Sequence, residues 1–244
     1  MKIFRFLSAC TVVAAIAMAL PSCNNSGDEK KSGSDTTNMK KTDTSTAMKT
    51  PAPPGDILIV MHKVKDYDKW LTVFERDDSI QKANGLTRVV IGKGLDDPSM
   101  VLIGFKMTDY EKAKAMSTSQ GLKDKMTAAG VIGAPMFHYI KLSVMDTTTN
   151  SMLDRLIVFS TVKDFAAWEK EYTTHGDVRK NGGTKDRGYG HDYSDDKKVF
   201  VVLGINDLAK ARDFSHSPQL KERMDSAGVV GKPDMFFYHV VKQY

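Results

Sequence analysis

Beyond position 55, short runs of aliphatic and β-branched residues alternate along the chain with stretches of helical periodicity. The runs 57–64 and 156–162 are rich in Val, Ile and Leu, which predicts buried strands. After the first run, Trp70 and Phe74 stand four residues apart and put an aromatic stripe on one helix face. Further strands are predicted at 100–106, 136–142, 198–205 and 235–241, and one more in each copy leads to the hairpin turns at 96–98 and 194–196.

Start and stop signals bound the helices between these strands. Asp66 and Asp164 stand where an N-cap carboxylate accepts from the free amides of a first turn, and Ser217, followed by proline, predicts another N-cap. Gly85 and Gly183 supply the left-handed position that ends a helix. Each half of the pattern therefore reads β-α-β-β-α-β.

The two halves are copies of one unit. The stretch 64–70 (VKDYDKW) recurs at 162–168 (VKDFAAW), a shift of 162 − 64 = 98 positions. The same shift, without a gap, matches AGVIGAP at 129–135 with AGVVGKP at 227–233. One constant shift over such a distance indicates a tandem duplication. We call the halves copy one and copy two.

A βαββαβ unit is the ferredoxin-like arrangement, in which helices cover one face of an antiparallel sheet. Here both alternating faces of a strand such as 57–64 are apolar, so the second face needs a partner. The other copy is the simplest partner. The predicted fold class is therefore α+β, with two tandem ferredoxin-like βαββαβ units at 56–146 and 153–244 forming an intramolecular pseudo-dimeric α+β barrel. We expect a monomer.

The sequence HKVKDYDKW at 62–70, the turn at Asp97 and the sequence SPQL at 217–220 resemble the dimeric α+β barrel superfamily. Within it, the chain is similar to antibiotic-biosynthesis-monooxygenase-like proteins and to small proteins named cyclases. The resemblance covers nearly all of both copies and implies the fold. For activity it implies a range: cofactor-free oxygenases, haem-degrading enzymes, decarboxylases and members without known activity. The Asn, Trp and His of the haem-degrading type have no match here, so no catalytic residue is carried over.

The N-terminal residues have the pattern of a lipoprotein signal peptide at 1–22. Lys2 and Arg5 precede an uncharged run at 6–20, which is shorter than the roughly 20 residues that span a bilayer. The sequence LPSC that follows resembles a lipobox, which predicts lipidation of Cys23. A secreted protein cleaved nearby is the alternative.

Residues 23–55 are rich in Ser, Thr, Asp and Lys and end in PAPP, which predicts a disordered tether. We therefore expect a lipid-anchored protein of the cell envelope, at the outer membrane, with a periplasmic or surface face. Its expected partner is the membrane, through the N-terminal acyl anchor.

Composition excludes several kinds of chemistry. The two cysteines, Cys10 and Cys23, both precede the predicted barrel, which therefore has no disulfide, no Cys-ligated zinc and no Cys nucleophile. The formal charge of +5 is mild, and no stripe of Lys and Arg with interleaved aromatics predicts nucleic-acid binding. We predict no cofactor and no metal.

His62 and His138 are the candidate catalytic residues. They lie near the end of the first strand and near the start of the last strand of copy one, which are antiparallel neighbours in a ferredoxin-like sheet. We therefore expect the two imidazoles to be cross-strand partners that act as a general base, a proton shuttle or a ligand contact. Copy two has Ser160 in place of His62. The alternative is two packed histidines at a strand edge.

The polar, glycine-rich stretch 181–192 supplies three candidate ligand-binding residues, Arg187, Tyr189 and His191, and Arg88 in copy one is a fourth. The stretch matches no phosphate loop. His191 and the aspartates after it have metal-ligand chemistry, but a mobile hairpin with solvated carboxylates is the favoured interpretation. The two arginines are candidates to steer an anionic ligand, with surface salt bridges as the alternative.

Three functions fit these features. The favoured one is an uncharacterised membrane-anchored lipoprotein that binds a small apolar ligand inside the barrel. The first alternative is a cofactor-independent monooxygenase-like or isomerase-like enzyme, which requires a cavity into which His62 and His138 point. The second is an envelope protein-interaction module, which requires an exposed apolar patch.

Overall fold

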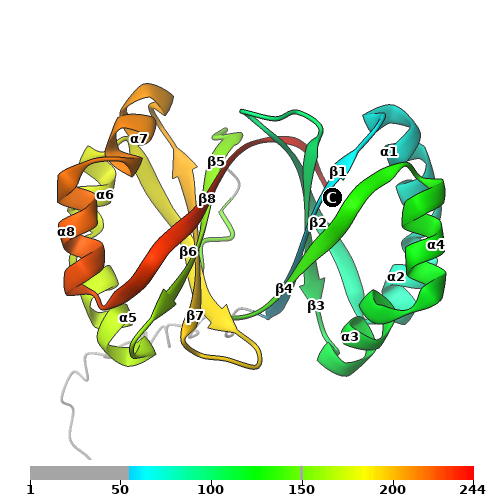
Figure 1. The fold of residues 1–244 in the computed structure, drawn as a ribbon, viewed down its shortest axis with the longest axis horizontal. Coiled ribbons are helices and arrows are strands. Elements are labelled where there is room, and N and C mark those ends of the chain that lie inside the picture. Colours follow the sequence, from blue (N-terminus) through cyan, green and yellow to red (C-terminus); the bar gives the residue numbers. More distant parts are fainter. Residues whose placement is uncertain (1–54, 149–150) are drawn as a thin grey trace, which may run out of the picture. The chain divides into compact units, whose positions relative to one another are not determined.

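The computed structural model describes residues 55–148 and 151–244 (Figure 1). The predicted signal peptide at 1–22, the lipidation candidate Cys23 and all of the predicted tether except Gly55 lie outside the described residues. Copy one comprises β1 (Asp56–Val64), α1 (Tyr67–Arg76), α2 (Asp78–Ala83), β2 (Leu86–Gly94), β3 (Met100–Met107), α3 (Tyr110–Thr118), α4 (Gln120–Ala128) and β4 (Val131–Met145). Copy two comprises β5 (Asp154–Val162), α5 (Phe165–Thr174), α6 (Gly176–Asn181), β6 (Thr184–Asp192), β7 (Lys198–Ile205), α7 (Leu208–Ser215), α8 (Pro218–Ser226) and β8 (Val229–Gln243).

The strands form one closed antiparallel barrel in the order β1-β3-β2-β8-β5-β7-β6-β4. Within it each copy keeps the ferredoxin-like strand order, and the copies join at two seams, β2 with β8 and β4 with β6. The two sheets face each other, and each copy carries its helices on the outer side of its own sheet (Figure 1). The predicted fold class, two ferredoxin-like units in a pseudo-dimeric α+β barrel, is confirmed.

The helix boundaries follow the capping chemistry of the sequence. The carboxylates of Asp66 and Asp164 accept from the backbone N–H three residues on, at 3.1 and 2.8 Å, and the hydroxyls of Ser119 and Ser217 do the same at 3.2 and 3.1 Å. Gly85 has φ +74°, the left-handed conformation expected of it. The first helical region of each copy, predicted as one helix, is instead two helices, α1–α2 and α5–α6.

The glycine-rich stretch 181–192 is mostly strand β6, which forms a hairpin with β7, so the predicted hairpin is present but its turn lies beyond the glycines, at 193–197. Gly188 and Gly190 let β4 approach closely at the seam. A Cβ at Gly190 would stand 2.0 Å from the Lys141 carbonyl oxygen, and one at Gly188 2.7 Å from that of Val144. The glycines therefore indicate a close approach of two backbones rather than a loop.

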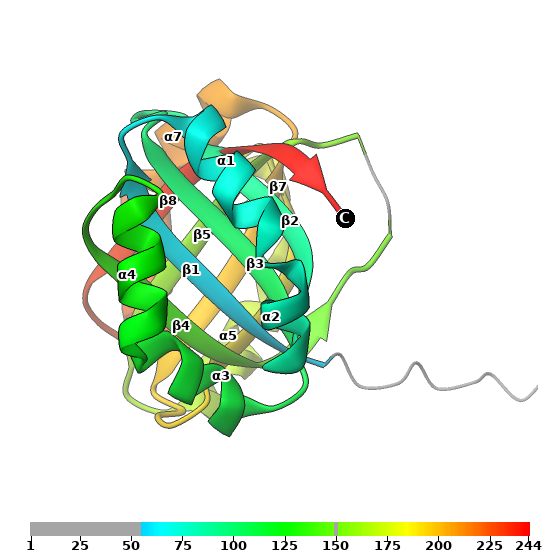
Figure 2. The same ribbon diagram turned by 90° about the vertical axis from the view of Figure 1, so that its right-hand side faces the viewer.

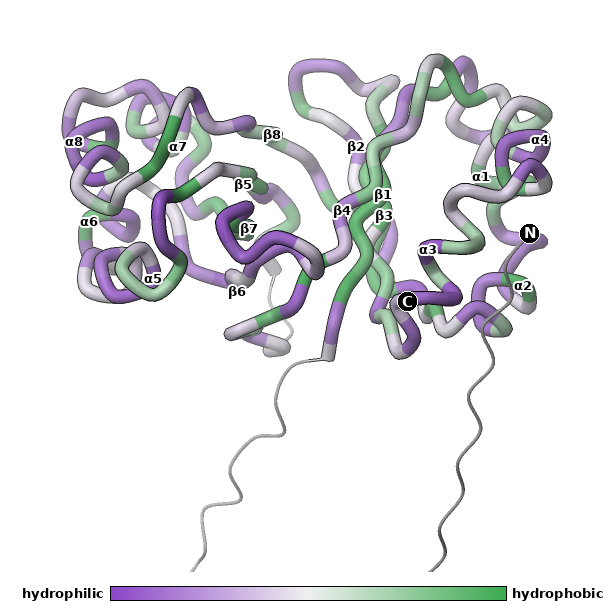
Figure 3. The backbone as a smooth tube through the Cα atoms, turned by 60° about the horizontal axis from the view of Figure 1, so that its bottom comes forward, coloured by the Kyte–Doolittle hydropathy of each residue, from purple (hydrophilic) through white to green (hydrophobic). Residues whose placement is uncertain are grey.

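Alternation along the strands divides the hydrophobic core into three layers. In β1, Leu58 and Val60 face the helices of copy one, whereas Ile59 and Met61 face the barrel interior. A matching helix layer lies in copy two. Figure 2 shows the helices of copy one over their sheet, and in Figure 3 the tube of β1 and β3 is largely hydrophobic. Among the described residues, no helix combines the length and the apolar character needed to cross a bilayer.

Candidate functional site

A cavity of about 440 Å³ lies between the sheet and the helices of copy one. We call it the helix-layer cavity. Its walls are mainly apolar and aromatic, from Leu58, Val60, Trp70, Phe74, Ile103, Phe105, Met116, Met126 and Phe137. Its volume lies within the range of small-molecule sites, roughly 300–1,000 Å³.

His62 points into this cavity from β1. Its side chain is 3% exposed, and its ring meets the Trp70 ring edge-on at 5.5 Å between centroids. Neither ring nitrogen has a hydrogen-bond partner among the described residues. Burial disfavours the charged imidazolium and lowers the pKa of His62 from 6.5 to about 4. At neutral pH the cavity therefore contains a neutral imidazole with one free donor and one free acceptor.

His138 lies on the other face of the sheet, so the predicted pairing with His62 is wrong. In the β1–β4 register His138 is opposite Ile59, and its ring stacks on Phe159 at 3.9 Å between centroids, on the barrel side. The register shifts between Met61 and Lys63, which leaves His62 without a cross-strand partner on β4. This irregularity places the two imidazoles in different layers.

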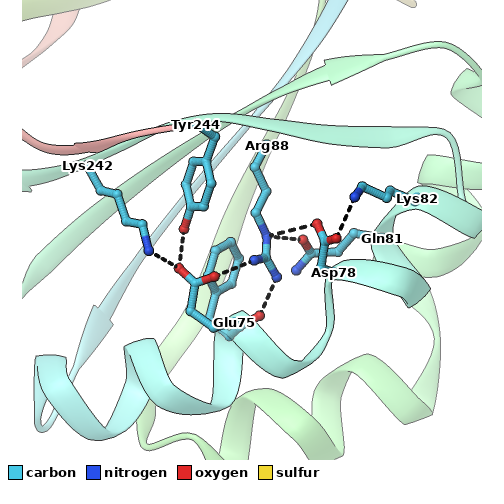
Figure 4. Close-up of polar contacts among 8 residues, drawn as sticks. Glu75, Asp78, Gln81, Lys82, Arg88, Lys242 and Tyr244 are labelled. Carbon is cyan, nitrogen blue, oxygen red and sulfur yellow. Dashed lines mark hydrogen bonds and ion pairs between the residues drawn. The ribbon is translucent and has the colours of Figure 1, made fainter.

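Arg88 of β2 is buried in a polar network (Figure 4), and its partners Gln81 and Phe74 line the helix-layer cavity. Its Nε donates to Gln81 Oε1 at 2.7 Å, its Nη1 to Glu75 Oε2 at 2.7 Å and its Nη2 to the Phe74 carbonyl at 2.5 Å. Glu75 also accepts from Lys242 and from Tyr244. All three guanidinium nitrogens are engaged, which favours a structural role over the predicted ligand contact.

The other predicted ligand-binding residues lie along β6, where Tyr189 and His191 face the copy two helix layer and Arg187 faces the barrel interior. Tyr189 packs among the aromatics of the copy two helix layer, and the His191 ring lies 4.8 Å from the Phe165 ring between centroids. Arg187 lines the barrel interior and pairs with Asp146 at 2.8 Å. The structure therefore does not bring the three together, and a ligand-binding role for each stays a prediction.

In copy two the equivalent cavity has a volume of only about 100 Å³. Ser160 replaces His62, and Phe214 replaces Met116 as a lining residue. The Phe214 ring lies against Gly182, where an added Cβ would stand 2.4 Å from the ring. An aromatic ring thus occupies much of the space that is open in copy one. The exchange of Met116 for Phe214 is visible in the aligned copies, yet it was not among the predicted site residues.

Among the residues that the structure describes, no three His, Cys, Asp or Glu side chains are grouped so that they could hold a metal ion.

No family model matches this sequence, and no curated protein does. Several solved structures share its fold. A monooxygenase candidate from Fusobacterium nucleatum subsp. nucleatum is 14% identical with a TM-score of 0.52, over 79% of this chain and 94% of its own. An anthrone oxidase-like protein is 11% identical with a TM-score of 0.54, over 78% and 93%. A chlorite dismutase candidate is 11% identical with a TM-score of 0.53, over 77% and 96%. At these identities the likeness shows the fold alone.

Proposed function

We propose that this protein binds a small, mainly apolar molecule in the helix-layer cavity of copy one, with His62 as its polar contact. The observation that carries the proposal is the buried imidazole, which faces an apolar cavity of about 440 Å³ with both nitrogens unpartnered. A buried polar group without a partner costs about 1–3 kcal/mol, and a ligand hydroxyl or carbonyl would supply that partner.

The cavity chemistry narrows the ligand class. Trp70 and Phe74 stack at 5.0 Å between ring centroids and form an aromatic wall, which suits a flat or aliphatic ring. The neutral state of His62 favours a neutral ligand with a single hydroxyl or carbonyl group. The site therefore differs from the predicted one, which was the barrel between the two sheets.

The experiment compares 2-naphthol with naphthalene as probes of the full chain. 2-Naphthol is expected to bind about fivefold more tightly, because its hydroxyl pairs with His62. His62→Ser, which installs the residue of copy two, removes the preference, whereas Ser160→His is the matched control and creates no second site. Equal affinities for the two probes, or a preference unchanged in His62→Ser, would contradict the proposal.

A second candidate function is cofactor-independent, monooxygenase-like catalysis in the same cavity. It is supported by the fold shared with a monooxygenase candidate and an anthrone oxidase-like protein. In this role His62 accepts a proton from a hydroxyl or an activated C–H group of the substrate. A pKa of about 4 makes the imidazole a weak base, which is why ligand binding is the first proposal. Oxygen uptake with a phenolic substrate, lost in His62→Ser, is the test.

We also propose that the chain is anchored to the cell envelope by lipid on Cys23, which the lipobox-like LPSC sequence supports. Metabolic labelling with an alkyne fatty acid is expected to mark the full chain. Cys23→Ser removes the label, and a label retained in that variant contradicts the assignment.

A further inference from the structure

A second cavity, of about 520 Å³, lies inside the barrel at the end where the two seams finish. We call it the barrel cavity. Its inner wall is aliphatic and aromatic, from Ile59, Leu102, Ile157, Phe200 and Val202. Two arginines, Arg155 of β5 and Arg187 of β6, line the same cavity. The space is therefore apolar along one part and cationic at another.

The two guanidinium groups are incompletely satisfied. Arg187 is 7% exposed and donates from Nη1 to Asp146 at 2.8 Å and from Nη2 to the Thr148 carbonyl at 3.0 Å. Its Nε is buried without a hydrogen-bond partner, and so is the Nε of Arg155, within the described part of the chain. Buried guanidinium groups are normally fully paired, so these two arginines retain unused hydrogen-bonding capacity beside the cavity.

The fold does not require positive charge at these positions. With the shift of 98 residues, Arg155 corresponds to Ile57 and Arg187 to Val89, and both of these line the same cavity from copy one. The same two positions are thus aliphatic in copy one and cationic in copy two. Asp146 is the one acidic side chain that lines the cavity among the described residues. Burial, and the neighbouring charge of Arg155, lower the pKa of Arg187, while Asp146 acts against them.

We propose that the barrel cavity binds an amphipathic carboxylate, whose anionic group lies between Arg155 and Arg187 and whose aliphatic chain lies along the inner wall. Carboxylates are the natural partners of guanidinium groups, through short charge-assisted hydrogen bonds. The anion relieves the repulsion between the two arginines and accepts hydrogen bonds from their guanidinium groups. The aliphatic chain is buried against Leu102 and Phe200, which adds hydrophobic stabilisation. The Lys106 ammonium, which also borders this cavity, adds to its positive potential.

The test uses decanoate and decan-1-ol as probes of the full chain, measured by calorimetry. Decanoate is expected to bind at a single site at least about tenfold more tightly than decan-1-ol, because the alcohol cannot form the charge-assisted bonds. With ¹³C-carboxyl-labelled decanoate, the bound carboxyl group is expected to titrate at lower pH than the free one. If the unsubstituted chain binds decanoate and decan-1-ol with equal affinity, the proposal is wrong.

Three variants separate a ligand contact from a structural role. Arg155→Ile and Arg187→Val install the residues of copy one, and each is expected to weaken decanoate binding about tenfold or more while leaving decan-1-ol binding unchanged. Asp146→Asn removes the competing carboxylate and is expected to strengthen decanoate binding, although it removes the partner of Arg187. Arg212→Gln, which deletes an exposed cation paired with Asp96, is the charge control and leaves the affinity unchanged.

The outcomes also separate this site from the helix-layer cavity. His62→Ser is expected to leave decanoate affinity unchanged, since His62 faces the other side of the sheet. If Arg155→Ile and Arg187→Val fold, as judged by circular dichroism, and still bind decanoate as the original chain does, the proposal is wrong. Weaker binding of decanoate in Asp146→Asn would also contradict it, because it would mean that Asp146 organises the arginines for structure alone.

Discussion

The two copies have the same order of strands and helices but differ in the volume of the cavity between sheet and helices. In copy one the helix layer keeps a cavity of about 440 Å³ around a buried imidazole, whereas in copy two about 100 Å³ remains. Both copies have the same Asp and Ser side-chain caps, left-handed glycines and strand register shifts. The residues that the copies share therefore determine the fold. A few exchanges, such as Met116 for Phe214, determine whether the helix layer contains a cavity large enough for a ligand.

The copies also place the same chemical group at one position from two different elements. In copy one Arg88 of β2 donates to the Phe74 carbonyl and lies 4.3 Å from the centre of the Phe74 ring. In copy two Arg179 of α6 donates to the matched Tyr172 carbonyl and lies 3.6 Å from the centre of that ring. The guanidinium thus occupies the same place but comes from a helix instead of a strand. The fold needs the group there, and either element can supply it.

The largest expected effect on stability comes from a substitution that breaks this polar network in copy one. Arg88→Met is expected to lower the free energy of unfolding by about 3–5 kcal/mol, because it removes one member of a buried charged network. Gln81→Arg with Arg88→Asp transplants the copy two arrangement and is expected to recover most of that loss. Urea titrations measure both. If the double variant is no more stable than Arg88→Met, the two networks are not equivalent.

The next effect is the pH dependence of stability that His62 gives to copy one. Unfolded, its imidazole protonates near pH 6.5, but in the fold it stays neutral down to about pH 4. The unfolded chain therefore binds the extra proton, and stability falls as the pH drops through that window, by up to about 3 kcal/mol. His62→Ser is expected to remove this part of the slope. Burial lowers the pKa of His138 too, so a slope remains, and an identical slope in both proteins would contradict the assignment.

The third prediction closes the helix-layer cavity of copy one with the residue of copy two. Met116→Phe is expected to weaken 2-naphthol binding about tenfold or more while changing stability by roughly 1 kcal/mol or less, since the ring enters existing space. The reciprocal Phe214→Met is expected to create weak binding in copy two. Unchanged affinity in Met116→Phe would show that the probe binds elsewhere.

The smallest effect concerns the C-terminal residue, which ties the β2–β8 seam to helix α1. Tyr244→Phe removes the hydroxyl that donates to Glu75, a bond formed at a half-exposed ring. The expected loss of unfolding free energy is about 0.5–1 kcal/mol, measured by thermal denaturation. Lys242→Met, which deletes the other tail contact of Glu75, serves for comparison. A loss as large as that of Arg88→Met would mean that the tail, rather than Arg88, holds the network together.

The fold was predictable from the sequence because its signals are local and occur twice. Asp66, Gly85 and Ser217 each report a helix end through their own backbone chemistry, and the constant shift between copies shows the symmetry of the barrel. The sequence also showed where the copies disagree, and His62 against Ser160 is such a place. These inferences need no knowledge of how distant side chains pack.

The site was predictable only in part because it depends on register and volume. His62 and His138 share a face only if β1 and β4 pair without a shift, and the shift after Met61 cannot be read from residue types. The volume of each cavity depends on how Phe214 packs against Gly182. Arg155 is different: its replacement of Ile57 is visible in the aligned copies, and the charge in a strand position was the signal to follow.

The short segment between β4 and β5 joins the two halves of the barrel in one chain, so one gene encodes both. In a pair of identical separate subunits every substitution is inherited by both, so a residue that fills one pocket fills its twin, and a charge placed beside the axis is always doubled. Here a substitution occurs once. Selection can therefore act on the two halves as on two different proteins that never need to find each other in solution.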